Sequence, residues 1–178
     1  MRYLIAFGVF FALAVAPVAR LNQAQADNHK ETLMLMELKT GIVKIALRED
    51  LAPGHVERIK TLIGEKFYDG IVFHRVIDGF MAQTGDPTGT GMGGSDYPDL
   101  RAEFSSEPFK RGTLGMARSQ HPDSANSQFF ICFDDASWLN GQYTVFGEVV
   151  EGMEHIDAIA KGEPPANPDN IISLRLEE

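Results

Sequence analysis

Residues 73–83 read Phe-His-Arg-Val-Ile-Asp-Gly-Phe-Met-Ala-Gln. Apolar and aromatic residues predominate in 71–77 and in 80–83, which predicts a strand in each, and Asp78-Gly79 between them is a dipeptide typical of turns. Arg75 therefore lies inside an apolar strand, where a charged side chain needs an explanation. The stretch predicts two adjoining β-strands that carry polar groups among apolar ones.

Shorter runs on both sides extend this β pattern. Residues 33–38 and 42–47 predict a hairpin, and apolar residues at helical spacing predict a helix over 53–67 that begins at Pro53. Further predicted elements are strands over 113–117, 128–133, 144–150 and 171–176 and a short helix over 153–160. About eight strands and two helices in one domain predict a mainly β fold, a closed eight-stranded antiparallel barrel capped by two α-helices. Closure would also remove exposed strand edges.

Composition excludes several classes of protein. The chain has 178 residues, which suits one domain, and a single cysteine, which excludes an intrachain disulfide framework and a multi-cysteine zinc site. Its formal charge of -9 argues against nucleic acid as a partner, because binding phosphates requires clustered Lys and Arg. Cys132 lies in an apolar strand, so we expect an inert buried thiol.

The N-terminus is typical of an export signal. Residues 1–26 contain no acidic residue, and Arg2 is followed by an apolar run over 3–18 and by the small-residue sequence Ala24-Gln25-Ala26. We predict a signal peptide cleaved after Ala26, a short arm over 27–32 and a domain over 33–178. The predicted location is the periplasm with no stable membrane insertion, and the alternative is an anchor formed by an uncleaved signal. Cleavage would leave 152 residues with 14 basic and 25 acidic side chains, a net charge of -11.

Several motifs suggest a chemistry that their context does not support. Residues 89–94 read Gly-Thr-Gly-Met-Gly-Gly, which matches the dinucleotide fingerprint, but residues 95–99 are poor helix formers and the fingerprint needs a helix there. The five histidines lack the close spacing of metal ligands, and no nucleophile elbow is present. We therefore predict no cofactor and no metal.

The central strands interleave polar and aromatic side chains. Met81 and Gln83 share one face of their strand, and Gln128 and Phe130 share one face of another. Spacing alone favours an ordinary interpretation in which Arg75 pairs with a surface acid and the aromatic and Met side chains join the core.

Longer motifs give this pattern a second interpretation. The segment 73–86 resembles the signature of cyclophilin-type peptidyl-prolyl cis-trans isomerases. Four more stretches match the family in the same order: Gly115-Met116-Ala117, Ser127-Gln128-Phe129-Phe130-Ile131, Trp138-Leu139-Asn140-Gly141 and Val145-Phe146-Gly147. The resemblance covers about residues 33–176. It implies an eight-stranded barrel with two helices and an isomerase that rotates X-Pro bonds without a cofactor.

The resemblance also assigns roles by position. It makes Arg75 the catalytic residue. The implied substrate-binding residues are Phe80, Met81, Phe130 and Leu139 in the proline pocket, Gln83, Ala117, Arg118 and Gln128 along the peptide backbone, and Trp138 and Tyr143 at the rim. The implied partners are proline-containing peptides and unfolded exported proteins, and we expect a monomer because one domain carries the whole set.

Two positions depart from the pattern of many eukaryotic members. Tyr143 stands where those members carry histidine, and Arg118 replaces a common asparagine. Tyr143 keeps an aromatic wall, so we expect activity with altered contacts at the rim. Trp138 matches the residue associated with cyclosporin in the family, which makes cyclosporin an implied ligand. A rival interpretation is a binding or chaperone module that uses the same groove without turnover.

Overall fold

The computed structural model describes residues 32–177. The predicted signal peptide and residues 27–31 of the predicted arm lie outside the described residues. Within 32–177 the strands are β1 (Leu33–Leu38), β2 (Gly41–Leu47), β3 (Arg75–Ile77), β4 (Met81–Thr84), β5 (Thr113–Met116), β6 (Phe129–Cys132), β7 (Val145–Glu151) and β8 (Ser173–Leu176). The helices of this part of the chain are α1 (Pro53–Gly64), the 3-10 turn η2 (Ser137–Leu139) and α2 (Met153–Asp157). Over the same residues, no helix combines the length and the apolar character that crossing a membrane requires.

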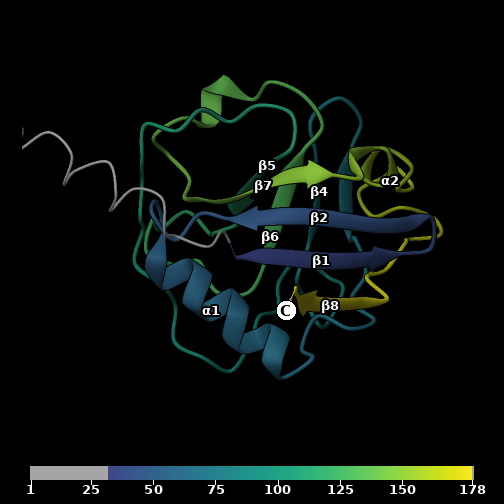
Figure 1. Cartoon of the computed structure of the whole chain (residues 1–178), viewed down its shortest axis with the longest axis horizontal. Helices are drawn as coiled ribbons and strands as arrows, with labels where there is room; N and C mark the ends of the chain where they lie inside the picture. The colour runs from purple at the N-terminus through teal and green to yellow at the C-terminus, as the bar shows by residue number, and fades with distance from the viewer. Residues whose placement is uncertain (1–31, 178) are drawn as a thin grey trace, which may run out of the picture. The chain divides into compact units, whose positions relative to one another are not determined.

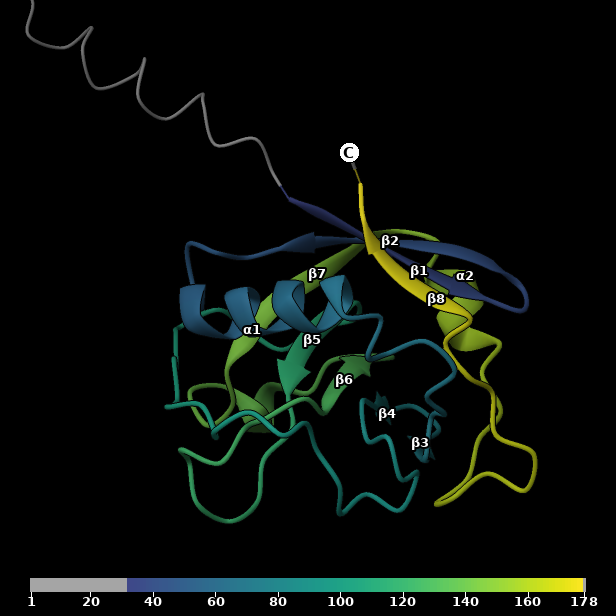
Figure 2. The same cartoon turned by 90° about the horizontal axis from the view of Figure 1, so that it is seen from below.

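The strands form one antiparallel sheet in the order β3-β4-β6-β5-β7-β2-β1-β8. The predicted hairpin at the start of the domain is present, with Leu38 opposite Gly41 at its turn. Helix α1 packs against β7 and β8, whereas α2 packs against β2. The two helices lie at opposite ends of the sheet (Figures 1 and 2).

The prediction of a closed barrel is wrong, because the sheet is an open half-barrel with β3 and β8 at its edges. The chain before β8 runs along the β3 edge and meets it through isolated bridges, Val76 with Gly162 and Val72 with Asn170. Three prolines lie between those two bridges, at positions 164, 165 and 168. Because proline has no N–H to donate, this segment cannot form the continuous ladder that closure needs.

The main core lies on one face of the sheet. Val76, Ala82, Ile131 and Leu114 are cross-strand neighbours on β3, β4, β6 and β5, and all four are buried in one apolar cluster. Helix α1 adds its own apolar stripe to this cluster, namely Val56, Ile59, Leu62 and Ile63. A second, smaller cluster lies apart from the first and includes Met81, Phe109, Phe130, Cys132 and Leu139.

Candidate active site

A row of cross-strand neighbours forms the base of the candidate site. Arg75 on β3 lies opposite Gln83 on β4, Gln83 lies opposite Phe130 on β6, and Phe130 lies opposite Gly115 on β5. Each of these residues is one position away from a member of the core row, so their side chains leave the other face of the sheet. The alternation of the strands therefore brings a guanidinium, an amide and an aromatic ring together.

Gly115 makes room for the aromatic rings in this row. A Cβ atom at this position would lie 2.3 Å from Cζ of Phe130 and 2.6 Å from Cε1 of Phe109. The two phenylalanine rings stack with centroids 5.7 Å apart. The absent side chain thus lets Phe130 lie low over the sheet, with Phe109 beside it.

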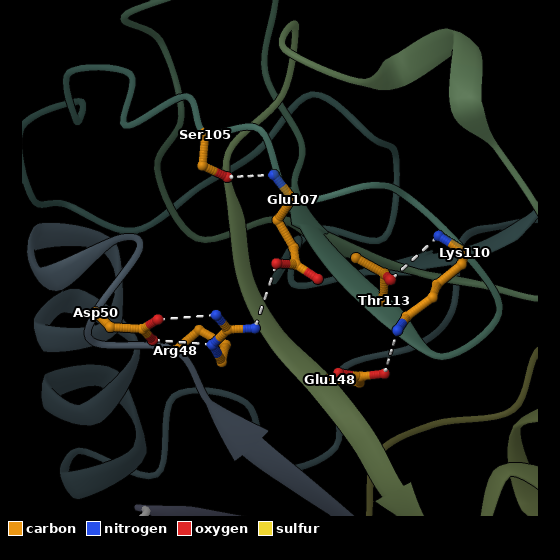
Figure 3. A network of polar contacts seen from close by, with 7 residues as sticks. All are labelled: Arg48, Asp50, Ser105, Glu107, Lys110, Thr113 and Glu148. Atoms are coloured by element: carbon orange, nitrogen blue, oxygen red, sulfur yellow. Dashed lines mark hydrogen bonds and ion pairs between the residues drawn. The ribbon is translucent and has the colours of Figure 1, made fainter. Parts of the chain in front are cut away.

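Polar contacts on both sides of Phe109 hold its segment in place. Arg48, which forms a bidentate pair with Asp50 at 2.8 and 2.9 Å, also lies 3.8 Å from a carboxylate oxygen of Glu107. On the other side, Lys110 pairs with Glu148 on β7 at 3.3 Å. Figure 3 shows these pairs together with the bonds that Ser105 and Thr113 make within the segment. The irregular chain before β5 is thereby fastened beneath the candidate site.

The outer face carries a cavity of about 280 Å³ above the row. Its lining residues all belong to the predicted site: Arg75, Phe80, Met81, Gln83, Ala117, Arg118, Phe130, Leu139 and Tyr143. Two predicted residues lie outside this lining. Gln128 lines an adjoining cavity of about 410 Å³, and Trp138 packs against Phe80 with ring centroids 5.4 Å apart. The structure thus gathers residues from the strands β3, β4 and β6, from η2 and from the loops next to these elements around one cavity.

Arg75 both pairs with a surface acid and lines the cavity. Its Nε donates to Glu163 Oε2 at 2.8 Å, so it does pair with a surface acid. The same side chain, 43% exposed, also lines the cavity. The ion pair therefore leaves part of the guanidinium facing the apolar walls.

Arg118 and Tyr143 form one side of the cavity together. The guanidinium carbon of Arg118 lies 4.5 Å from the centre of the Tyr143 ring, and its Nη2 donates to the backbone carbonyl of Gln142 at 2.9 Å. The Tyr143 ring meets the Phe130 ring edge-on, with centroids 5.8 Å apart. The side chain of Arg118 thus holds the loop that carries Tyr143.

Gln128 joins the row to the glycine-rich loop. Its Oε1 accepts a hydrogen bond from Gln83 Nε2 at 2.9 Å, and its Nε2 donates to the carbonyls of Gly91 and Gly93 at 3.1 and 2.8 Å. Through these bonds Gln128 fixes the amide of Gln83 and the adjacent loop at the same time. It acts within this structure as a brace between the two cavities.

The glycine-rich loop, residues 89–94, does not present a phosphate site. The amide of Gly91 and the amide of Thr88, just before the loop, already donate to the carboxylate of Asp86, at 2.6 and 2.8 Å. Partial burial opposes ionisation of Asp86, but the hydrogen bond from the Thr88 hydroxyl, together with the bonds from backbone amides, outweighs it and lowers the pKa of the carboxyl to about 2. An anion would therefore meet a fixed negative charge where the fingerprint requires open N–H groups.

Other groups that could carry chemistry are inert or scattered. Cys132 is buried in the second cluster, and burial raises the pKa of its thiol to about 12. Residues 32–177 contain no cluster of three His, Cys, Asp or Glu side chains able to hold a metal ion.

Comparison with known proteins assigns the family. The model for cyclophilin type peptidyl-prolyl cis-trans isomerases matches residues 33–176. The chain belongs to the cyclophilin family. It is 50% identical to a probable peptidyl-prolyl cis-trans isomerase of Brucella suis over 99% of this chain and 96% of that one. It is 41% identical to peptidyl-prolyl cis-trans isomerase B of Bacillus subtilis over 68% and 85%.

Solved cyclophilin structures share the fold. A cyclophilin type isomerase of Cryptosporidium parvum superposes with a TM-score of 0.77 at 29% identity, over 83% of this chain and 98% of that one. A second structure of the same protein, determined in the presence of the dipeptide Ala-Pro, gives a TM-score of 0.76 at 30% identity, over 82% and 99%. The chain is therefore a peptidyl-prolyl cis-trans isomerase of cyclophilin fold.

Sequence reasoning missed three residues around this cyclophilin site. Glu163 lies in the Pro-rich loop and is 88 residues from Arg75, so no local pattern links the two. Phe109 lies in a segment without periodicity. Gly115 lies in one of the family motifs, but only the strand register shows that it lies opposite Phe130. A single glycine inside a strand is a known signal of close approach, and it could have marked this position.

Proposed function

We propose that this isomerase rotates X-Pro bonds by stabilising a twisted amide with Arg75. The uncatalysed rotation is slow because partial double-bond character imposes a barrier of about 18–20 kcal/mol. In the twisted amide the prolyl nitrogen leaves conjugation, and its lone pair can accept a hydrogen bond. The guanidinium supplies a donor that stays charged at any working pH.

The remaining cavity residues would hold the peptide during rotation. Phe80, Met81, Phe130 and Leu139 offer apolar walls for the proline ring, and they would exclude water from the hydrogen bond as it forms. Gln83 has its Nε2 engaged by Gln128, which leaves its oxygen to accept from a backbone N–H of the peptide. One side of the amide is then fixed while the other turns.

One observation carries this proposal: a charged donor and apolar walls share one cavity. The test compares Arg75→Ala and Arg75→Lys with the unmutated enzyme, using NMR exchange spectroscopy on a proline-containing tetrapeptide. We expect Arg75→Ala to lower the catalysed rate about 100- to 1000-fold, as for loss of one preorganised donor, and Arg75→Lys to restore part of it.

Arg111→Ala is the matched control. Arg111 is also half-exposed, at 48%, and pairs with Asp157 at 2.7 Å outside the cavity. Its loss should leave the exchange rate unchanged. Wild-type exchange by Arg75→Ala would overturn the proposed role of Arg75. Peptide binding without acceleration by the unmutated protein would instead favour the binding-module interpretation.

We further propose that its substrates are exported polypeptides and that it assists their folding in the periplasm. The support is the signal-like pattern of residues 1–26. Mass spectrometry of the protein from its host should give Asp27 as the first residue, and an intact Met1 would contradict export by cleavage. Refolding of a protein with a proline-limited slow phase should accelerate with the enzyme and not with Arg75→Ala.

Two further proposals concern the binding of cyclosporin and the oligomeric state. Trp138 is the single tryptophan of the chain and is 57% exposed beside Phe80, so we propose that it contacts the drug. A change in tryptophan fluorescence on titration with cyclosporin would support this contact, and an unchanged spectrum would contradict it. We propose a monomer, for which sedimentation should give the mass of one chain.

A further inference from the structure

Glu163 lies directly opposite Arg75 on the edge of the sheet. Val76 and Gly162 exchange both backbone hydrogen bonds, each at 2.8 Å, in an antiparallel bridge. The next pair of this register is Arg75 with Glu163, so the two side chains leave the same face. The row at the candidate site therefore continues past Arg75 to a carboxylate.

The loop that carries Glu163 is fixed on both sides. Gly162 adopts φ +146°, and a Cβ there would lie 2.6 Å from Cα of Pro165, so the turn into the loop requires glycine. Further along, the carbonyl of Asp169 accepts from the N–H of Phe73 at 2.8 Å, and its carboxylate accepts from the N–H of Ala160 at 2.9 Å. The backbone thus presents Glu163 to Arg75 from a defined position.

The contact engages one edge of the guanidinium. Glu163 Oε2 accepts from Nε of Arg75 at 2.8 Å, while the guanidinium also lines the cavity. Gln83 is the cross-strand neighbour of Arg75 on the opposite side. An arginine side chain has several rotatable bonds, and a carboxylate on its Nε restricts them to fewer rotamers, here to one in which the side chain lines the cavity.

We propose that Glu163 is a positioning residue for Arg75, a role that rests on the proposed function of that arginine. Glu163 acts by holding the guanidinium in the orientation that meets the twisted amide, and it does not touch the proline itself. Its carboxylate is 52% exposed, so the ion pair contributes little to stability. Loss of Glu163 should instead lower the catalytic rate, because a small displacement of a hydrogen-bond donor slows the reaction.

The test is a double-mutant cycle with Arg75→Ala, Glu163→Ala and the double variant. We expect Glu163→Ala to lower kcat about threefold to tenfold with KM nearly constant, and to have no further effect in the Arg75→Ala background. Glu163→Gln keeps an oxygen acceptor for Nε and should recover part of the rate. Asp157→Ala, which breaks the comparable pair with Arg111 outside the cavity, is the matched control and should leave kcat unchanged.

An NMR spectrum of the arginine side chains gives a second readout, which reports whether the contact at Nε is present in solution. The Nε–H signal of Arg75 should shift in Glu163→Ala and stay in place in Asp157→Ala, while thermal unfolding is the same in both. Wild-type kcat in Glu163→Ala, or an equal loss with and without Arg75, would overturn the proposal. If Arg75→Ala alone kept full activity, the proposed function of Arg75 would fail, which is a different result.

Discussion

Two adjacent rows of cross-strand neighbours run across β3, β4, β6 and β5, and their side chains lie on opposite faces of the sheet. Val76, Ala82, Ile131 and Leu114 form one row, and they are buried in the main core. The adjacent row is Arg75, Gln83, Phe130 and Gly115, and it forms the base of a cavity of about 280 Å³. Each strand therefore gives alternate side chains to stability and to the site. Changes in the first row should affect folding, and changes in the second should affect turnover.

The largest effect on stability is expected from a truncation on the core face. Phe129 is fully buried and meets the rings of Tyr68 and Phe146 edge-on. Phe129→Ala should lower the free energy of unfolding by about 3–5 kcal/mol, because it leaves a cavity in the core. Denaturant unfolding measures this loss. The catalysed rate per folded molecule should stay within about twofold of wild type, since Phe129 faces away from the site. A large loss of rate in the folded fraction would contradict the separation of the two faces.

Gly115→Ala should affect both properties. The added methyl would meet the rings of Phe130 and Phe109, which must shift toward the cavity. We expect a loss of about 1–3 kcal/mol in stability and about tenfold in kcat/KM. The control is Gly64→Ala, because a Cβ at Gly64 meets nothing within 4 Å. Equal kcat/KM in both variants would show that the space above Gly115 is not used by the substrate.

Arg118→Ala should have a smaller effect at the rim. The guanidinium packs on Tyr143 and holds the carbonyl of Gln142, so its loss loosens one wall of the cavity. We expect KM to rise about twofold to fivefold with kcat nearly constant, since a cation–π contact at an exposed site contributes about 0.5–1 kcal/mol. Steady-state kinetics on the tetrapeptide measures this split. A fall in kcat comparable to that of Arg75→Ala would place Arg118 among the catalytic groups.

The smallest expected effect is a gradual loss of stability with falling pH. Burial lowers the pKa of both His55 and His74, and Glu103 opposes this at His55. The unfolded chain then binds protons that the folded protein excludes, so the free energy of unfolding should fall as pH drops below about 6.5. His74→Phe removes one of these two buried imidazoles and should therefore reduce the slope. An unchanged slope between pH 6.5 and 5 would exclude His74 as a source.

The alternation of the central strands was predictable from the sequence. A period of two places Phe130 and Gln128 on the face opposite Phe129 and Ile131, and the structure confirms this, because Phe129 and Ile131 lie in the main core and Phe130 in the second cluster. The same period puts Met81 and Gln83 beside the cavity. The periodic pattern sufficed here because each strand is buried on one face by a core and on the other by a smaller cluster.

Contacts between distant segments were not predictable in the same way. Whether the sheet closes depends on how the loop with Pro164, Pro165 and Pro168 pairs with β3, and a composition rich in proline shows only that it is a loop. The pairing of Arg75 with Glu163 depends on the same register. Phe109 reaches the ring of Phe130 from an irregular segment, whose path is set by ion pairs at both sides rather than by periodicity.

The most direct measurement compares two neighbours on β3. The exchange rate of a proline-containing peptide is measured by NMR at equal concentrations of folded Arg75→Ala and Val76→Ala. Val76→Ala should be less stable yet exchange the peptide at the wild-type rate per folded molecule, because Val76 faces the core. Arg75→Ala should keep its stability and lose about 100-fold or more of the catalysed rate. Equal losses of rate in the two variants would contradict the account that the core face of the sheet provides stability and the cavity face provides catalysis.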